Sequence, residues 1–288
     1  MIPERPIWEP LPNCTVTILC SGPQSAVIWA METRTLQLVL QYDGARFAGW
    51  QRQPDERTVQ GVLEDAIERL CGTHITVLGA GRTDAGVHAL GQAAGVRVQE
   101  KWTPPVLKRA LNAVLPRDIR VSQTHQMVED FHARYSATER AYRYLVGTDE
   151  DAESPFRFGR ELAWRKPLDS LLLDECATMI LGDRSFRGFA VKGTAPESDD
   201  HHCIVRSAKW VERSGGLAFS ITANRFLHHM VRFLVGTMLD VGSGRRDIGV
   251  ITRLLESANN HEVSPPAPPY GLYLERVDYP TQLYLVTA

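Results

Sequence analysis

One aspartate in this chain stands in a setting suited to chemistry. Asp84 lies within residues 79–88, GAGRTDAGVH, among glycines and alanines. Arg82 precedes it by two positions and can hold the carboxylate ionised or contact a phosphate group. An ionised aspartate in a fixed position can act as a nucleophile or a base. The alternative is a glycine-rich turn in which Asp84 only accepts hydrogen bonds from the amides that follow it.

This segment is predicted to be a loop between two strands. Residues 74–78 (HITVL) are rich in β-branched and apolar side chains, and residues 91–98 (GQAAGVRV) read as a second strand. We expect Gly79, Gly81 and Gly86 to permit a positive φ or the close approach of a ligand.

A second group of candidate residues lies within 224–232, NRFLHHMVR. Arg232 stands among apolar residues, where a guanidinium needs a partner, and a carboxylate such as Asp84 would serve. The alternative is an arginine that extends to solvent. His228 and His229 would point about 100° apart on a predicted helix, so we expect no metal site there.

Two further segments mix aromatic, arginine and amide side chains. They are residues 42–53 (YDGARFAGWQRQ) and 131–144 (FHARYSATERAYRY). Such mixtures stack nucleotide bases and hold phosphates. Packing at a core edge and a solvated basic face are the alternatives. In the second segment, Tyr142 and Tyr144 share one face of a predicted strand, with Arg140 in phase.

Length, net charge and cysteine content limit which folds and functions are possible. With 288 residues the chain can bury a large core, and we expect two subdomains. The net charge of −2 does not indicate nucleic-acid binding by the whole surface, so a polyanion site must be a local basic cleft. The five cysteines form no CxxC pair, which favours reduced thiols and a cytoplasmic location.

The first 34 residues are interpreted as an extension of unknown role. No apolar run reaches the length of a membrane span, and no basic cluster precedes the apolar residues as in a signal peptide. Met31 comes just before a clear strand signal, so a start codon at that position is a hypothesis.

Periodicity predicts alternating strands and helices, and hence an α+β or α/β fold in two layers. The proposed subdomains are residues 35–147 and 148–288. Strands are predicted at 35–42, from 119, and at 137–146, 204–211, 217–222 and 273–279. Helices are predicted at 59–70, 104–114, 171–181, 227–241 and 248–256.

Five motifs in order resemble one enzyme family. They are YDG at 42–44, GRTDAGVH at 81–88, YRY at 142–144, MVR at 230–232 and GLYL at 271–274. Together they are similar to the TruA-type tRNA pseudouridine synthases over residues 36–280. Motifs in register are far more specific than any one alone.

The resemblance implies isomerisation of uridine to pseudouridine at positions 38 to 40 of the tRNA anticodon arm, without cofactor or metal. Asp84 matches the family's catalytic aspartate, expected to act as a nucleophile. Tyr142 would stack on the uracil and could take part in proton transfer. Arg232 would pair with the carboxylate, and Arg82 would hold the flipped nucleotide. The remaining substrate-binding residues implied are Leu272, Arg46 and Gln51.

The family's fold implies two α+β subdomains with antiparallel sheets flanked by helices around a central RNA-binding cleft, usually as a homodimer. Two departures from the pattern concern substrate positioning. Ala141 follows Arg140 where paired basic residues are common, and Ser185 stands where an acidic residue is common.

Three other functions are weighed against this one. A tRNA-binding or chaperone-like protein would have no need of a nucleophile. A nucleoside or glycoside hydrolase would need a second carboxylate, and no motif supplies one. A pseudouridine synthase with another RNA target is the nearest alternative.

Overall fold

A computed structural model describes residues 32–194, 200–257 and 259–285 of the chain. The chain divides into Met1–Met31 and a compact unit, Glu32–Ala288. Only the second unit is described below. The expectations for the extension up to residue 31, including a start at Met31, concern residues outside the described part.

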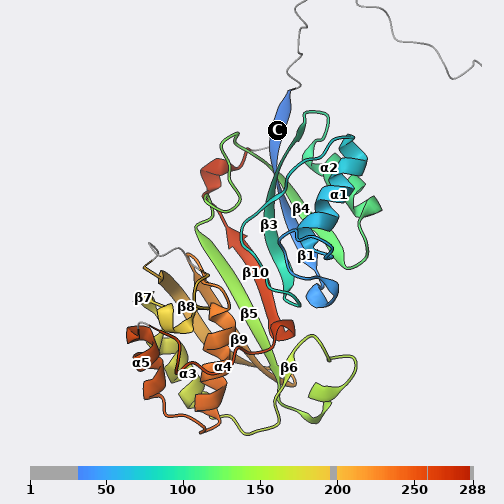
Figure 1. The fold of residues 1–288 in the computed structure, drawn as a ribbon. Helices are drawn as coiled ribbons and strands as arrows, with labels where there is room; N and C mark the ends of the chain where they lie inside the picture. The colour runs from blue at the N-terminus through green and yellow to red at the C-terminus, as the bar shows by residue number, and fades with distance from the viewer. Residues whose placement is uncertain (1–31, 195–199, 258, 286–288) are drawn as a thin grey trace, which may run out of the picture. The chain divides into compact units, whose positions relative to one another are not determined.

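The strands of this unit form a single mixed sheet, with the order β4-β1-β3-β10-β5-β9-β8-β7 (Figure 1). Short β2 pairs with β3, and short β6 pairs with β5. The strands are β1 (Thr33–Tyr42), β2 (Leu78–Gly79), β3 (His88–Gln99), β4 (Ile119–Met127), β5 (Glu139–Gly147), β6 (Leu162–Ala163), β7 (Gly182–Ser185), β8 (His202–Arg213), β9 (Gly216–Ala223) and β10 (Leu272–Asp278).

The last strand joins the two predicted halves. β10 pairs in parallel with β3, where Tyr273 lies opposite His88, and antiparallel with β5, where Leu272 lies opposite Tyr144. The strands of both halves therefore belong to one sheet. The antiparallel pairing predicted for the fold holds for most neighbours, whereas the division at residue 147 stays a prediction.

Helices pack at both ends of this strand order. They are α1 (Val59–Cys71), α2 (Pro104–Val114), α3 (Ser170–Met179), α4 (Met230–Gly242) and α5 (Gly249–Glu256). α1 and α2 accompany β1, β3 and β4, and the other three accompany β7, β8 and β9 (Figure 1). None of the helices in the described residues is long and apolar enough to cross a membrane.

Local chemistry explains the helix ends. The Thr58 hydroxyl accepts from the Gly61 amide at the start of α1, and Gly72 ends that helix in the left-handed region. Pro104 and Pro105 open α2, where their missing N–H groups cost nothing. These boundaries agree with the sequence predictions.

Two of the boundary errors lie near the candidate residues Asp84 and Arg232. Residues 74–77 are not strand, and only Leu78 and Gly79 pair with β3. The helix predicted from residue 227 begins at Met230, because His229 has a φ of 60° and ψ of 3°. This left-handed residue interrupts the helical path that the apolar spacing suggests.

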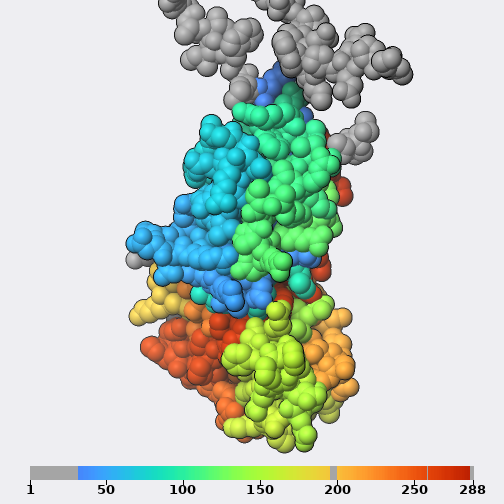
Figure 2. All heavy atoms as spheres, turned by 90° about the vertical axis from the view of Figure 1, so that its right-hand side faces the viewer, coloured from blue at the N-terminus to red at the C-terminus, as the bar shows by residue number. Residues whose placement is uncertain are grey.

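The segment between β5 and α3 forms its own surface region, seen as yellow-green spheres in Figure 2. It contains two short 3₁₀ or strand pieces, Glu150–Glu153 and β6. Glu161 is buried there and contacts both Arg157 and Arg213, so the segment is tied to the end of β8.

Candidate active site

The loop that carries Asp84 connects β2 to β3 and is held by hydrogen bonds to the end of β1 and to the residues that follow it. The Trp50 amide donates to the Thr83 carbonyl over 3.0 Å, and the hydroxyls of Tyr42 and Thr83 lie 2.8 Å apart. Gly86 adopts a φ of 80°, which a side chain would strain. The YDG and GRTDAG motifs are therefore two parts of one structure.

The Asp84 carboxylate faces three nitrogen groups. Arg232 Nη1 lies 2.9 Å from Asp84 Oδ2, and His229 Nε2 lies 3.2 Å from the same oxygen. His228 Nε2 lies 3.5 Å from Oδ1. The Asp84 side chain is 21% exposed, so solvent and a ligand can reach it.

Arg232 is anchored as well as paired. Its Nε donates to the Ala267 carbonyl over 2.8 Å, and its side chain is only 12% exposed. The expectation that this arginine finds a carboxylate partner, rather than extending to solvent, is confirmed. Because Asp84 and Arg232 are 148 positions apart, their meeting is a tertiary contact.

The geometric argument against a shared histidine site is wrong. It assumed that His228 and His229 lie on a helix, but both precede α4, and their rings lie 4.1 Å apart with both Nε2 atoms turned to Asp84. The ligand atoms of the three residues lie within 4.8 Å of one another. The Arg232 cation already occupies the shared carboxylate, and we assign no metal.

Tyr142 is buried on β5, with its ring edge-on to Phe226 at 5.0 Å. Burial raises the pKa of its phenol, and the nearby Tyr42 and Asp84 add to this shift. The hydroxyl is therefore kept in its protonated form. Tyr144, on the same strand, donates to the Pro268 carbonyl and belongs to the core.

The other predicted site residues differ in their exposure to solvent. Arg82 and Gln51 meet at the surface, where Arg82 Nε donates to Gln51 Oε1 over 3.1 Å. Arg82 therefore does not hold Asp84 in this structure. Arg46 is exposed on the 3₁₀ turn after β1, and Leu272 is buried at the start of β10.

Two side chains that support the loop were not predicted to do so. Arg140 donates to four carbonyls, including those of Ala80 at the start of the loop and Asn224 just before the histidines. Gln92, fully buried on β3, donates to the Gly81 carbonyl. The in-phase spacing of Arg140 with Tyr142 is the available signal, although the mixture of aromatic and arginine side chains around it suggests a nucleotide-binding segment or a solvated basic face instead.

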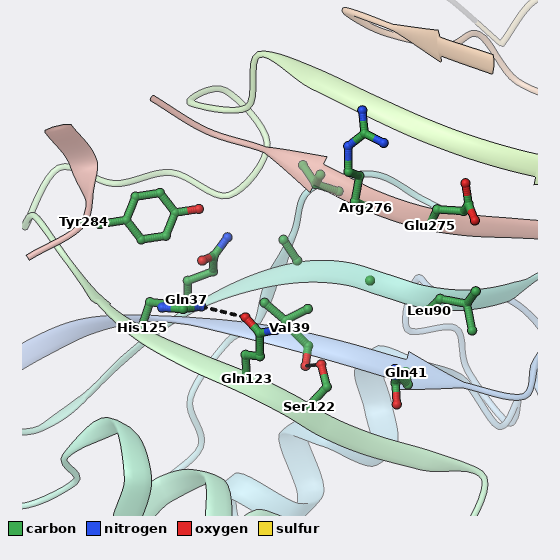
Figure 3. Close-up of a pocket in the computed structure, with 13 residues that line it drawn as sticks. Gln37, Val39, Gln41, Leu90, Ser122, Gln123, His125, Glu275, Arg276 and Tyr284 are labelled. Atoms are coloured by element: carbon green, nitrogen blue, oxygen red, sulfur yellow. Dashed lines mark hydrogen bonds between the residues drawn. The ribbon is translucent and has the colours of Figure 1, made fainter. Parts of the chain in front are cut away.

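A hollow of about 320 Å³ lies elsewhere, across β1, β3, β4 and β10 (Figure 3). Its lining mixes amide, apolar and charged side chains, and His125 Nε2 lies 3.2 Å from Gln123 Oε1 within it. It contains none of the residues that contact Asp84. We therefore treat the loop, and not this hollow, as the candidate active site.

Comparison with known proteins defines the class of this fold and site. The family model described as tRNA pseudouridine synthase matches residues 38–136 and 176–280, which include Asp84 and Arg232 but not Tyr142. The chain belongs to this family, whose members are isomerases. The expected family and its fold class are therefore confirmed.

Curated relatives are similar over nearly their whole length. A protein named tRNA pseudouridine synthase A from Brachyspira hyodysenteriae is 37% identical, over 84% of this chain and 96% of its own. Proteins of the same name from Methylacidiphilum infernorum and Chlorobium luteolum are each 39% identical, over 85% and 86% of this chain. These two alignments cover 95% and 96% of the relatives' own lengths.

Proposed function

We propose that this chain isomerises uridine to pseudouridine at positions 38, 39 and 40 of the tRNA anticodon stem-loop, with Asp84 as the nucleophile. The observation that carries the proposal is the solvent-reachable Asp84 carboxylate, paired with Arg232 at 2.9 Å. Membership of the tRNA pseudouridine synthase family supports the reaction class.

The composition of the site favours an isomerase over a hydrolase. Within the described part of the chain, the side chains that pair with Asp84 are one guanidinium and two imidazoles. A glycoside hydrolase instead needs a second carboxylate across the scissile bond. A lone carboxylate suits a reaction that breaks the N-glycosidic bond, turns the uracil and rejoins it through carbon.

Base access requires that the uridine leave its stack, at a cost of a few kcal/mol. We assign Tyr142 to stack on the uracil, and Arg82 with Gln51 to hold the flipped nucleotide. The exposed Arg82–Gln51 pair and the exposed Arg46 are available to RNA. Leu272 would form part of the pocket wall.

The same proposal includes a cytoplasmic homodimer that needs neither a cofactor nor a metal. A cleft rather than the net charge of −2 would attract the tRNA. Sedimentation or light scattering with and without tRNA tests the dimer, and a monomer in both conditions would contradict it.

Tritium release tests the reaction itself. The substrate is tRNA labelled at uracil C5, because isomerisation must expel that hydrogen. We expect release by the wild type and none by Asp84→Asn, which keeps the side-chain shape but removes the charge. Binding of tRNA is expected to persist in Asp84→Asn.

Further outcomes distinguish the target positions, the nucleophile and the reaction class. A tRNA with cytidine at 38, 39 and 40 should release no tritium, and release from it would overturn the assigned positions. Release by Asp84→Asn at the wild-type rate would overturn the nucleophile. Binding without release by the wild type would favour a tRNA-binding protein.

A further inference from the structure

The candidate active site holds two histidines to which the proposed function gives no task. His229 Nε2 approaches the same Asp84 oxygen that Arg232 binds, and His228 Nε2 approaches the other. The His229 side chain is 26% exposed and that of His228 is 45% exposed. His229 is therefore the more enclosed of the two.

The proposed reaction needs a base at its end, whichever atom Asp84 attacks first. The uracil C5 forms a bond to C1′ of the ribose and still carries its hydrogen. A base must take this proton, and the electron pair of the C5–H bond then restores the C5=C6 double bond. N1, released from the sugar, takes one proton from solvent, so the uracil has the same atoms before and after.

Geometry narrows the choice of base. C5 is bonded to C1′ at this stage, and Asp84, as the proposed nucleophile, must have reached one of these two bonded groups, the uracil or the sugar. The base must then lie beside the Asp84 carboxylate. A guanidinium has donors but no acceptor nitrogen, so Arg232 cannot serve as the base. Burial keeps the phenol of Tyr142 protonated, which suits a hydrogen-bond donor better than a base.

We propose that the imidazole of His229 takes the C5 proton through Nε2 and passes it to solvent on the side of His228. The proposal rests on the proposed function, because it needs the target uridine bound at Asp84. Once the carboxylate is engaged with substrate, its negative charge no longer holds a proton on His229 Nε2.

The backbone gives independent support. His229 lies in the left-handed region, with a φ of 60°, and its side chain makes no cap hydrogen bond to the helix that follows. Such conformations concentrate at functional sites, where surrounding structure maintains them. Here the His229 carbonyl accepts from the Phe233 amide over 3.0 Å, and the ring turns toward Asp84 instead of capping α4.

The electrostatic setting suits a base. Burial lowers the pKa of His229, the adjacent Arg232 and His228 lower it further, and Asp84 opposes them. The imidazole is therefore neutral at neutral pH. It gains a proton only when the pH falls below the ordinary pKa of a histidine. We expect the wild-type rate to fall on the acid side as this group becomes protonated.

The test separates proton removal from the earlier steps. His229→Gln keeps a polar side chain near Asp84 but cannot accept the proton. Two substrates are compared, tRNA with ordinary uridine and tRNA with 5-fluorouridine at the target position. Fluorine cannot leave as a cation, so the second substrate stops at the carbon-linked intermediate, which mass spectrometry of digested tRNA detects.

We expect His229→Gln to release tritium from ordinary uridine about 100-fold more slowly than the wild type. Deuterium at C5 should slow the variant further, because proton removal has become rate-limiting. The 5-fluorouridine tRNA should react at close to the wild-type rate. The acid-side fall in rate attributed to His229 should be absent.

Equal slowing on both substrates would show that His229 only positions Asp84 and would overturn the proposal, as would unchanged tritium release. His228→Gln and Tyr142→Phe are compared in the same assay. If either of these variants slows tritium release but not the reaction of 5-fluorouridine tRNA, and His229→Gln does not, the base is assigned to the wrong residue. Failure of the wild type on both substrates would instead refute the proposed function.

Discussion

At the scale of single residues, Arg232 joins parts of the chain that lie far apart in sequence. Its Nε binds the Ala267 carbonyl, and its Nη1 binds Asp84. Both contacts use separate nitrogens of one planar group, which a lysine could not reproduce. The arginine therefore fixes the direction of the carboxylate.

Arg232→Met should lower both stability and turnover. An acceptor left without its charged partner costs about 1 to 3 kcal/mol, and a comparable loss of transition-state stabilisation slows turnover about 10- to 100-fold. Thermal unfolding and tritium release measure the two effects. Arg143→Met is the matched control, because the Arg143 side chain is 45% exposed in its pair with Glu275, whereas that of Arg232 is 12% exposed, and solvent weakens an ion pair. Equal effects of the two changes would contradict the role of Arg232.

At the scale of elements, the Asp84 loop is held by close packing against the residues after β1. A Cβ atom on Gly79 would lie 2.4 Å from Trp50 Cε2. Gly81 has no described neighbour within 4 Å of its Cβ position and no positive φ. The expectation of a positive φ is thus confirmed for Gly86. Gly79 has no positive φ and instead leaves room for the Trp50 ring, and neither backbone conformation nor protein packing requires a glycine at position 81.

Gly79→Ala should destabilise the fold by about 1 to 3 kcal/mol, because the rigid Trp50 ring must shift. Gly81→Ala should stay within about 0.5 kcal/mol of the wild type. Urea unfolding of the two variants checks this contrast. Similar midpoints would mean that the loop relaxes freely and is not held by Trp50. A turnover loss confined to Gly81→Ala would indicate close approach of RNA there.

At the scale of the whole described unit, contacts between distant segments connect the surface region after β5 to the site. Glu161 contacts Arg157 and Arg213. The Gly159 carbonyl accepts from His88 Nε2, because His88 Nδ1 already accepts from the Gly44 amide. His88 is the last residue of the Asp84 motif, so this network reaches the active-site loop.

Glu161→Gln should destabilise the protein by about 2 kcal/mol or more, since a buried carboxylate that serves two arginines is neutralised. Glu153→Gln is the control in the same region, because its carboxylate is exposed and lies 4.0 Å from Arg165. Calorimetry compares the two unfolding temperatures. A loss no greater than that of the control would show that the network contributes nothing to stability.

Much of the fold could be predicted because its signals are local. The apolar spacing of α1, with Thr58 before it and Gly72 after it, gives both ends of that helix. Failures occurred where tertiary contacts override local preference. Of the strand predicted at residues 74–78, only Leu78 is part of β2. His229 breaks the helical pattern that its neighbours suggest.

The sequence by itself determined the family, the candidate nucleophile and the kind of partner that Arg232 requires, because residue types and motif order are written in the chain. Tertiary structure decided which groups meet. It placed β10 between β3 and β5 and paired Arg82 with Gln51 instead of Asp84. It also turned both histidines toward Asp84. Strand order and side-chain convergence depend on contacts between residues far apart in sequence, which local periodicity does not encode.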